Sequence, residues 1–239
     1  MRDKKIWIFN AGNVFDGNPK WLFMYIVNYR KDITPYWFCY TEETRDYIRK
    51  LGYKAFLFKS KMAEKIGSQA GIYVVNQNKE VFQPYLKGII VLNLWHGVGC
   101  KAIEKNVRSG FLNERVTKKN IINKDVYQKY QLFLVTSPLM EKHFIEQCDL
   151  PKDKIIRAGY PCCFYKGKVE TYDHDILKQK KLPEDTKIAV YAPTYRDASA
   201  TNFFSKAIPD MEKLVDVLEK NNYLLIFKMH PLMANDFQY

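Results

Sequence analysis

Short apolar runs alternate with longer amphipathic segments along this chain, and that alternation constrains its fold more than any other feature. Apolar runs of four to six residues are typical of strands buried in a parallel sheet, and the amphipathic segments between them are typical of covering helices. The pattern therefore predicts an α/β fold with Rossmann-like βα alternation. The predicted strands in the first part of the chain are Ile6–Phe9, Tyr36–Tyr40, Ala55–Phe58, Ile72–Val75, Ile89–Leu94, Leu132–Val135 and Ile155–Ala158.

Helix-boundary residues lie between these runs. Asn18 followed by Pro19 predicts a helix start, with Asn18 as the N-cap. Glu42–Leu51 is predicted to be a helix that Gly52 ends, because glycine is favoured just past a helix C-terminus. A further helix is predicted from Ser137 to about Cys148.

A domain boundary is expected near Gly159-Tyr160-Pro161, which gives a Rossmann-like domain at residues 1–160 and a second at 161–239. Beyond the boundary we predict a strand at Lys187–Ala192, a helix at Pro209–Asn221 and a strand at Tyr223–Lys228. The apolar residues of that helix, which we expect to face inward, are Met211, Leu214, Val215 and Leu218. Two strands and a helix do not complete a Rossmann-like domain, so we expect the second domain to be incomplete and the chain to be a fragment.

Composition limits the partners and the compartment. A formal net charge of +12 predicts acidic partners, such as nucleic acid, anionic lipid or a polyanionic substrate. The five cysteines form no CxxC pair, which predicts reduced thiols in a cytoplasmic protein. No run approaches the ~20 apolar residues of a membrane span, so any membrane contact is expected to be peripheral. The many aromatic residues (Tyr 17, Phe 15) are interpreted as packing.

The segment Lys101–Gln131 combines a basic excess with interleaved apolar residues. Such a segment can lie on an anionic membrane surface. It can equally form a solvated helical face whose apolar side packs on the domain. The sequence leaves both interpretations open.

Histidine follows the strongest predicted strand, in Leu94-Trp95-His96-Gly97. Open α/β sheets bind ligands outside the carboxyl ends of their strands, and Gly97 lets a ligand approach the backbone closely. His96 there can accept a proton from a hydroxyl near neutral pH. The alternative is a structural histidine hydrogen-bonded at a strand end.

Two further motifs stand at strand ends in the second part of the chain. Thr194 and Arg196, after the strand at Lys187–Ala192, can bind a phosphate, or they belong to an ordinary surface loop. Lys228 and His230 alternate at the end of the last strand and so share one side of the sheet, where they suit a diphosphate. His143 and His174 are predicted to be solvated. The chain has no zinc-type spacing, so no metal and no cofactor are expected.

Taken together, five short motifs resemble the CDP-glycerol glycerophosphotransferase family, the teichoic acid and capsule polymerases and primases of bacterial envelopes. They occur in the family's order and span nearly the whole chain. They are Phe15-Asp16-Gly17-Asn18-Pro19-Lys20, Leu94-Trp95-His96-Gly97 with Lys101, Gly159-Tyr160-Pro161, Tyr191–Asp197 and Lys228-Met229-His230-Pro231.

The resemblance implies a GT-B-like fold, in which two Rossmann-like domains face each other across a cleft. It implies transfer of glycerol phosphate, or a related alditol phosphate, from a CDP-linked donor to a hydroxyl of a polyanionic polymer or its lipid-linked primer, with release of CMP. His96 and His230 match the family's leading catalytic candidates. The expected substrate-binding residues are Gly97, Lys101, Thr194, Arg196 and Lys228. The enzyme would work at the inner face of the cell membrane, on an anionic surface.

Two departures bear on specificity. Val98-Gly99-Cys100 replaces the Thr and Pro or Leu that often follow the histidine-glycine pair, which resembles a capsule-type branch. Cys162 stands where the family often has Arg.

Three other functions remain open at this stage. They are a GT-B glycosyltransferase that uses a nucleotide sugar, a nucleic-acid-binding protein, and a non-catalytic membrane-associated domain. Because no nucleic-acid-binding motif is recognised, we expect no nucleic acid partner.

Overall fold

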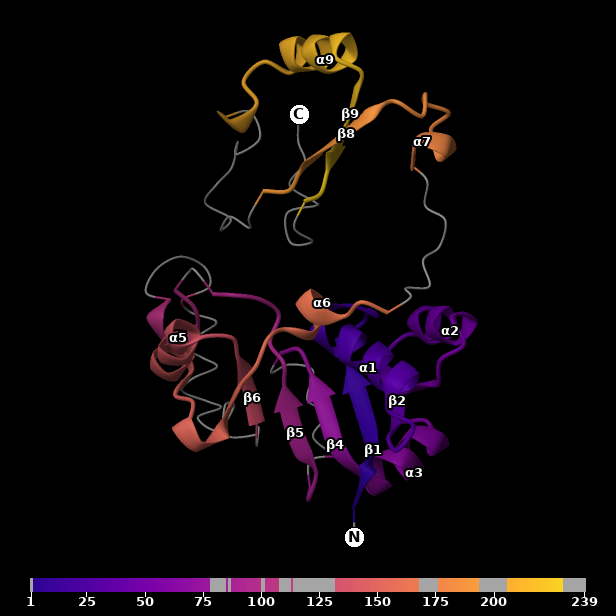
Figure 1. Cartoon of the computed structure of the whole chain (residues 1–239), viewed down its shortest axis with the longest axis vertical. Coiled ribbons are helices and arrows are strands. Elements are labelled where there is room, and N and C mark those ends of the chain that lie inside the picture. The colour runs from indigo at the N-terminus through magenta and orange to yellow at the C-terminus, as the bar shows by residue number, and fades with distance from the viewer. Residues whose placement is uncertain are drawn as a thin grey trace. The chain divides into compact units, whose positions relative to one another are not determined.

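The computed structural model describes residues 2–77, 85, 87–99, 102–107, 113, 132–167, 176–193 and 206–229. The chain forms two compact units. The first contains the elements from β1 to α6, and the second those from α7 to β9 (Figure 1).

Seven parallel strands form the sheet of the first unit, in the order β3-β2-β1-β4-β5-β6-β7. The strands are β1 (Asp3–Asn10), β2 (Thr34–Cys39), β3 (Ala55–Leu57), β4 (Ala70–Val75), β5 (Ile90–Asn93), β6 (Leu132–Val135) and β7 (Ile155–Arg157). The helices are α1 (Gly17–Tyr29), α2 (Glu42–Lys50), α3 (Lys61–Gln69), α5 (Pro138–Cys148) and α6 (Pro161–Phe164), with 3-10 turns η3 (Glu104–Asn106) and η5 (Lys152–Lys154).

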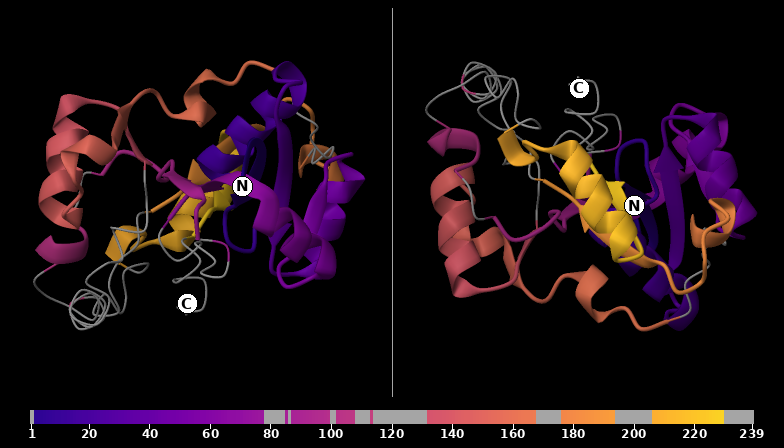
Figure 2. Two further views of the ribbon diagram at one scale, coloured as in Figure 1. Left: turned by 90° about the horizontal axis from the view of Figure 1, so that it is seen from below. Right: turned by 90° about the horizontal axis from the view of Figure 1, so that it is seen from above.

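This strand order is doubly wound. The chain builds outward from β1 to β3, returns through α3, and builds in the other direction from β4 to β7. In Figures 1 and 2, α2 and α3 accordingly stand at one end of the sheet and α5 at the other. The predicted Rossmann-like α/β fold is confirmed, and each predicted strand of this unit is present with its ends shifted by at most three residues.

Helix starts follow local capping chemistry. The Ser137 hydroxyl accepts from the Met140 amide at 3.2 Å, ahead of Pro138, and the helix predicted from Ser137 to about Cys148 is present as α5. The prediction that Asn18 caps α1 is wrong. Asp16 is the N-cap, since its carboxylate accepts from the Gly17 amide at 2.7 Å, and the Asn18 side chain is directed into the protein instead.

Aromatic rings fill the core between α1 and the sheet. Phe23 on α1 is fully buried and meets Phe9 of β1 and Trp37 of β2 edge-on, at centroid distances of 5.3 and 5.7 Å. Phe15, in the loop before α1, packs edge-on against Trp37 at 4.6 Å. Edge-to-face pairs contribute roughly 0.5–1.5 kcal/mol beyond their buried area. The interpretation of these aromatic residues as packing is confirmed for this cluster.

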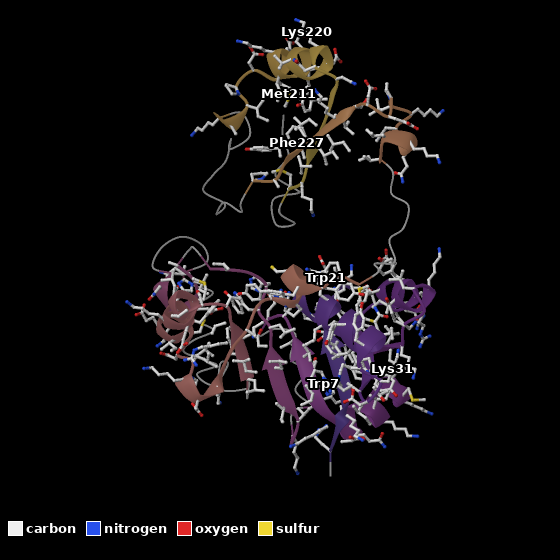
Figure 3. All side chains as sticks on the ribbon, viewed as in Figure 1. Trp7, Trp21, Lys31, Met211, Lys220 and Phe227 are labelled. Atoms are coloured by element: carbon white, nitrogen blue, oxygen red, sulfur yellow. The ribbon has the colours of Figure 1, made fainter. Side chains whose placement is uncertain are left out.

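The second unit contains α7 (Ile176–Gln179), β8 (Lys187–Tyr191), α9 (Met211–Lys220) and β9 (Tyr223–Phe227). β8 and β9 pair in parallel, and the rings of Tyr191 and Phe227 meet edge-on at 6.0 Å (Figure 3). The other residues of the inward stripe on α9 are half-buried, but Val215 is 41% exposed, so its predicted inward orientation is wrong. The reason is that β8 and β9, the two described strands of this unit, form a narrow sheet, which can cover only a narrow apolar stripe of α9.

Candidate active site

The predicted histidine lies at the carboxyl edge of the sheet, close to the point where the strand order reverses. β1 and β4 are neighbours there, and β5, which precedes His96, is the next strand. Loops that leave the two sides of such a switch point diverge, and open α/β sheets bind ligands in the crevice this creates. The arrowheads of β1, β4 and β5 point to this edge in Figure 1, and α6 lies beside it.

His96 is exposed at this edge. Its Nδ1 lies 3.4 Å from the carbonyl oxygen of Asn76, which follows β4. In the tautomer that carries a proton on Nδ1, the ring donates to this carbonyl, and Nε2 is the ring nitrogen that can accept a proton. The arrangement therefore suits a general base.

The indole of Trp95 packs against the imidazole of His96 and holds it in place. Its indole is buried, stacks on the His96 ring at 4.3 Å, and packs against Phe133 of β6 and Phe144 of α5. Its backbone has φ +54°, a left-handed conformation that is uncommon for a non-glycine residue, and its amide donates to Asn93 Oδ1 at 2.8 Å. Residues held in this way often mark functional loops.

Gly97 continues the turn in a conformation that favours glycine, at φ +151°. A Cβ added there would meet no atom within 4 Å, so backbone geometry and not crowding explains the glycine. The Gly97 carbonyl accepts from the hydroxyl of Tyr160 at 2.8 Å. Burial raises the pKa of Tyr160 to about 12, so this hydroxyl remains a donor throughout the physiological range.

His143 packs beside this loop, and the prediction that it is solvated is wrong. It is half-buried on α5, and its ring nitrogens lie 2.6 and 3.1 Å from Nε2 of Gln147. A Cβ added at Gly99 would lie 2.7 Å from His143 Nε2, so the imidazole fills the space that the glycine leaves. Gln147 also accepts from the Ile103 amide, which ties the stretch after His96 to the same helix.

The second unit brings two predicted motifs to one edge. The Lys228 amide donates to the Tyr191 carbonyl at 2.9 Å, so the segments that leave β8 and β9 start side by side. The Lys228 side chain is exposed at this edge. Lys101, Thr194, Arg196 and His230 lie outside the described residues, as do His174 and most of Lys101–Gln131, so their assigned roles stay predictions.

Cys39, Cys162 and Cys163 are free thiols. Cys162 and Cys163 are exposed, with their sulfur atoms 3.8 Å apart, whereas Cys39 and Cys148 are buried. Burial raises the pKa of Cys39 to about 11, and burial together with the Cys163 thiol raises the pKa of Cys162. Raised pKa values leave little thiolate, so these two thiols are poor nucleophiles.

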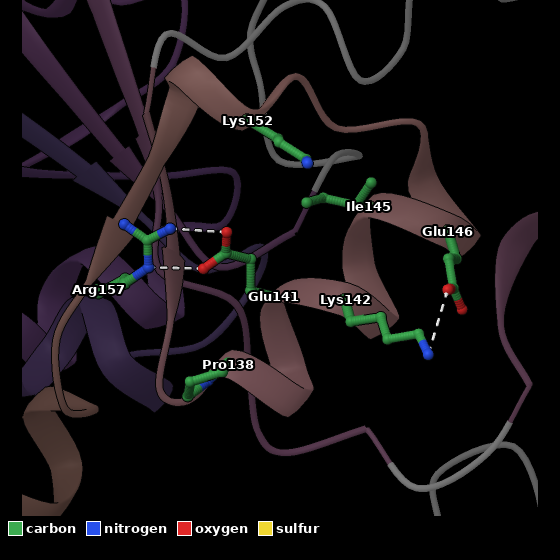
Figure 4. Close-up of a pocket in the computed structure, with 7 residues that line it drawn as sticks. All are labelled: Pro138, Glu141, Lys142, Ile145, Glu146, Lys152 and Arg157. Atoms are coloured by element: carbon green, nitrogen blue, oxygen red, sulfur yellow. Dashed lines mark hydrogen bonds and ion pairs between the residues drawn. The ribbon is translucent and has the colours of Figure 1, made fainter.

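A separate hollow of about 500 Å³ lies between α5 and β7 (Figure 4). In it Arg157 donates twice to the Glu141 carboxylate, at 2.6 and 2.7 Å. This pairing lowers the pKa of Glu141 and keeps the carboxylate ionised. No predicted site residue lines the hollow, so we do not assign the reaction to it.

Two features are absent from the described residues. Within that part of the chain, no group of three His, Cys, Asp or Glu side chains is placed to hold a metal ion. None of its helices is long and apolar enough to cross a membrane.

Comparison with known proteins identifies the family of the chain. The whole chain, residues 1–239, matches the family described as CDP-Glycerol:Poly(glycerophosphate) glycerophosphotransferase. The chain therefore belongs to this family of transferases, which confirms the resemblance read from its motifs.

Curated relatives act in teichoic acid synthesis. The chain is 32% identical over 148 residues to the teichoic acid glycerol-phosphate primase of Bacillus spizizenii, covering 59% of this chain and 36% of the primase. It is 24% identical over 259 residues to the teichoic acid poly(glycerol phosphate) polymerase of the same organism, covering 98% of this chain and 61% of the polymerase. The chain thus spans less than two thirds of the length of these relatives.

Solved structures support the fold. The wall teichoic acid polymerase TagF matches with a TM-score of 0.71 at 20% identity, over 100% of this chain and 59% of TagF. A TagF variant soaked with CDPG matches with a TM-score of 0.73 at 20% identity, over 99% of this chain and 59% of that one. A UDP-N-acetylglucosamine 2-epimerase from Rickettsia bellii matches with a TM-score of 0.54 at 12% identity, over 97% of this chain and 64% of the epimerase.

Proposed function

We propose that this chain supplies the histidine-bearing half and part of the donor half of an enzyme that transfers glycerol phosphate, or a related alditol phosphate. The donor is CDP-linked, and the acceptor is a hydroxyl of a teichoic-acid-like or capsule polymer or its lipid-linked primer. The observation that carries the proposal is family membership over the whole chain, together with His96 at the carboxyl edge of the sheet.

In the proposed reaction the acceptor oxygen attacks the phosphorus that carries the alditol. The new phosphodiester P–O bond forms as the pyrophosphate P–O bond to CMP breaks. His96 takes the proton from the acceptor hydroxyl, and CMP leaves with the electron pair of the broken bond. His230, Arg196 and Lys228 stabilise charge on the diphosphate, Thr194 orients a phosphate oxygen, and Gly97 and Lys101 contact substrate, in the manner of phosphoryl transfer.

The proposal divides the roles between two domains. In the proposed GT-B-like arrangement, residues 1–160 meet the acceptor and residues 161–239 begin the donor domain. A UDP-sugar glycosyltransferase is the competing function, since nucleotide-sugar enzymes share this type of fold. Donor choice separates the two.

The test is CMP release from CDP-glycerol and from CDP-ribitol with a phosphoalditol acceptor. It should be run on this chain and on the longest natural reading frame that contains it. Release that depends on His96, with a loss of roughly 10²–10⁴-fold in His96→Ala, supports the proposal. Turnover of UDP-sugars with no turnover of either CDP-alditol would overturn it.

We also propose that the protein works in the cytoplasm, at the inner face of the cell membrane. The net charge of +12 supports contact with anionic lipid and with a polyanionic product. Co-sedimentation with phosphatidylglycerol vesicles should therefore weaken with salt and be absent with neutral vesicles. Equal binding to both vesicle types would contradict an electrostatic contact.

A further inference from the structure

We propose that Asn18 is a positioning residue for the loop Trp95–Gly97, and that Tyr160 holds the same loop from its other side. The inference rests on the proposed role of His96 in the reaction. The sequence predicted that Asn18 is a helix cap, whereas its contacts in the fold assign it a different role.

Both polar atoms of the Asn18 side-chain amide form hydrogen bonds in the protein interior. The residue is only 2% exposed. Its Nδ2 donates to the Trp95 carbonyl at 2.8 Å and approaches the Leu94 carbonyl at 3.4 Å. Its Oδ1 accepts from the Cys162 amide at 3.4 Å. One buried side chain therefore joins α1, the histidine loop and the segment that begins α6.

These contacts determine where His96 sits. The Trp95 carbonyl belongs to the peptide that leads directly into His96, and the Gly97 carbonyl lies two residues further along the chain, just after His96. Asn18 holds the first and the Tyr160 hydroxyl holds the second. With the backbone fixed on both sides, Trp95 can keep its left-handed conformation at φ +54°. Without these contacts we expect the loop to relax and the imidazole to move.

The helix itself does not require this amide. Asp16 caps α1, so the Asn18 side chain is not needed to start the helix. Close packing also fixes the start of α1, because a Cβ added at Gly17 would lie 2.9 Å from the side chain of Asn76. The backbone carbonyl of the same Asn76 faces His96. The start of α1 and the histidine are thus parts of one packed assembly at the switch point.

The chain offers a matched control pair. Asn28 on the same helix donates from its amide to the hydroxyl of Tyr165 at 2.8 Å, on the exposed side. Asn28→Ala and Tyr165→Phe therefore remove the same chemical groups as Asn18→Ala and Tyr160→Phe, but leave the histidine loop untouched.

The experiment measures kcat, KM and the pH profile of CMP release for these variants, in the longest natural chain that contains this sequence. A misplaced catalytic group can cost about 10²-fold, so we expect kcat to fall about 10–100-fold in Asn18→Ala and Tyr160→Phe. KM should change little, the acidic limb of the pH profile should move, and the controls should stay near wild type. Adding Asn18→Ala to His96→Ala should cause no further loss, because Asn18 acts through His96.

A second readout separates failure of this inference from failure of the proposed function. The NMR titration of the His96 imidazole C–H signal reports its surroundings without any turnover. A shifted titration in Asn18→Ala or Tyr160→Phe, but not in the controls, supports positioning even if His96→Ala keeps its activity. An unchanged titration overturns it. Tyr160→Phe keeps the buried ring and so carries the test if Asn18→Ala fails to fold.

Discussion

Arg2 ties the start of the chain to two distant segments, and removing it should weaken the first unit measurably. Its guanidinium donates to the carbonyls of Gly67 at 2.6 Å, Ala70 at 2.8 Å and Tyr85 at 3.0 Å, all part-buried contacts. A fourth contact, to the Lys87 carbonyl at 2.6 Å, is exposed. Burial lowers the pKa of Arg2, but a guanidinium stays charged under all ordinary conditions.

The magnitude follows from these contacts. A hydrogen bond from a charged donor contributes about 1.5–3 kcal/mol to stability. When the donor is removed, water binds the released carbonyls, so the net loss per contact is smaller. Counting about 1 kcal/mol for each part-buried contact, we expect Arg2→Met to lower the free energy of unfolding by about 3 kcal/mol. For a unit of this size, that corresponds to a melting temperature lower by about 6–12 °C.

Urea unfolding followed by tryptophan fluorescence measures the change, with Lys4→Met as the control, because Lys4 is an exposed cation at the start of β1. Arg2→Lys should recover only about 1 kcal/mol, since a single ammonium cannot reproduce the fork of the guanidinium. If Arg2→Met were within about 0.5 kcal/mol of Lys4→Met, the contacts would not stabilise the fold and the reasoning would be refuted.

Three further predictions concern single contacts. Gly99→Ala should reduce CMP release by about 10-fold, because its Cβ would lie 2.7 Å from His143 Nε2, and adding His143→Ala should restore part of the loss. Gly71→Ala should destabilise the protein by about 3 kcal/mol in urea unfolding, since its Cβ would lie 2.6 Å from the Asp3 carbonyl oxygen, a backbone atom that cannot move aside. Arg30 donates to Asp32 and lowers the pKa of that carboxyl to about 2, so the stability from this pair should be complete above about pH 4 and lost as the pH falls to about 2. Acid unfolding of Asp32→Asn should lack this contribution.

Much of the fold could be predicted because a buried parallel strand is an uninterrupted apolar run. Leu132–Val135 was predicted to the residue, and Ser137, the predicted start of the helix, is the N-cap of α5. α3 (Lys61–Gln69) was missed, because this short helix buries only Ala63, Ile66 and Gly67, two of which are small residues, so it has no long apolar stripe. Ser60, which caps it with an oxygen 3.3 Å from the Ala63 amide, was the available signal.

The site could be predicted only in part, because strand ends are visible in a sequence but long-range contacts are not. His96 was found since it directly follows an apolar run. The role of Asn18 depends on a partner 77 residues away, and that of Tyr160 on one 63 residues away. His143 lies on a charged helix, which predicts a solvated residue, and only the fold shows that Gly99 leaves room for its ring.

The motif Leu94-Trp95-His96-Gly97 is recognisable because it belongs to the core and to the site at once. Leu94 and Trp95 are buried, and Trp95 packs between β6 and α5 through Phe133 and Phe144. The next residue, His96, is exposed. A turn this abrupt needs a left-handed residue and then a glycine, at φ +54° and +151°. The Trp95 indole therefore fixes the orientation of the His96 ring by stacking on it, at a centroid distance of 4.3 Å. It follows that Trp95→Leu should disturb the histidine as well as the core, whereas a core substitution at Phe23, which meets β1 and β2 instead, should affect stability alone.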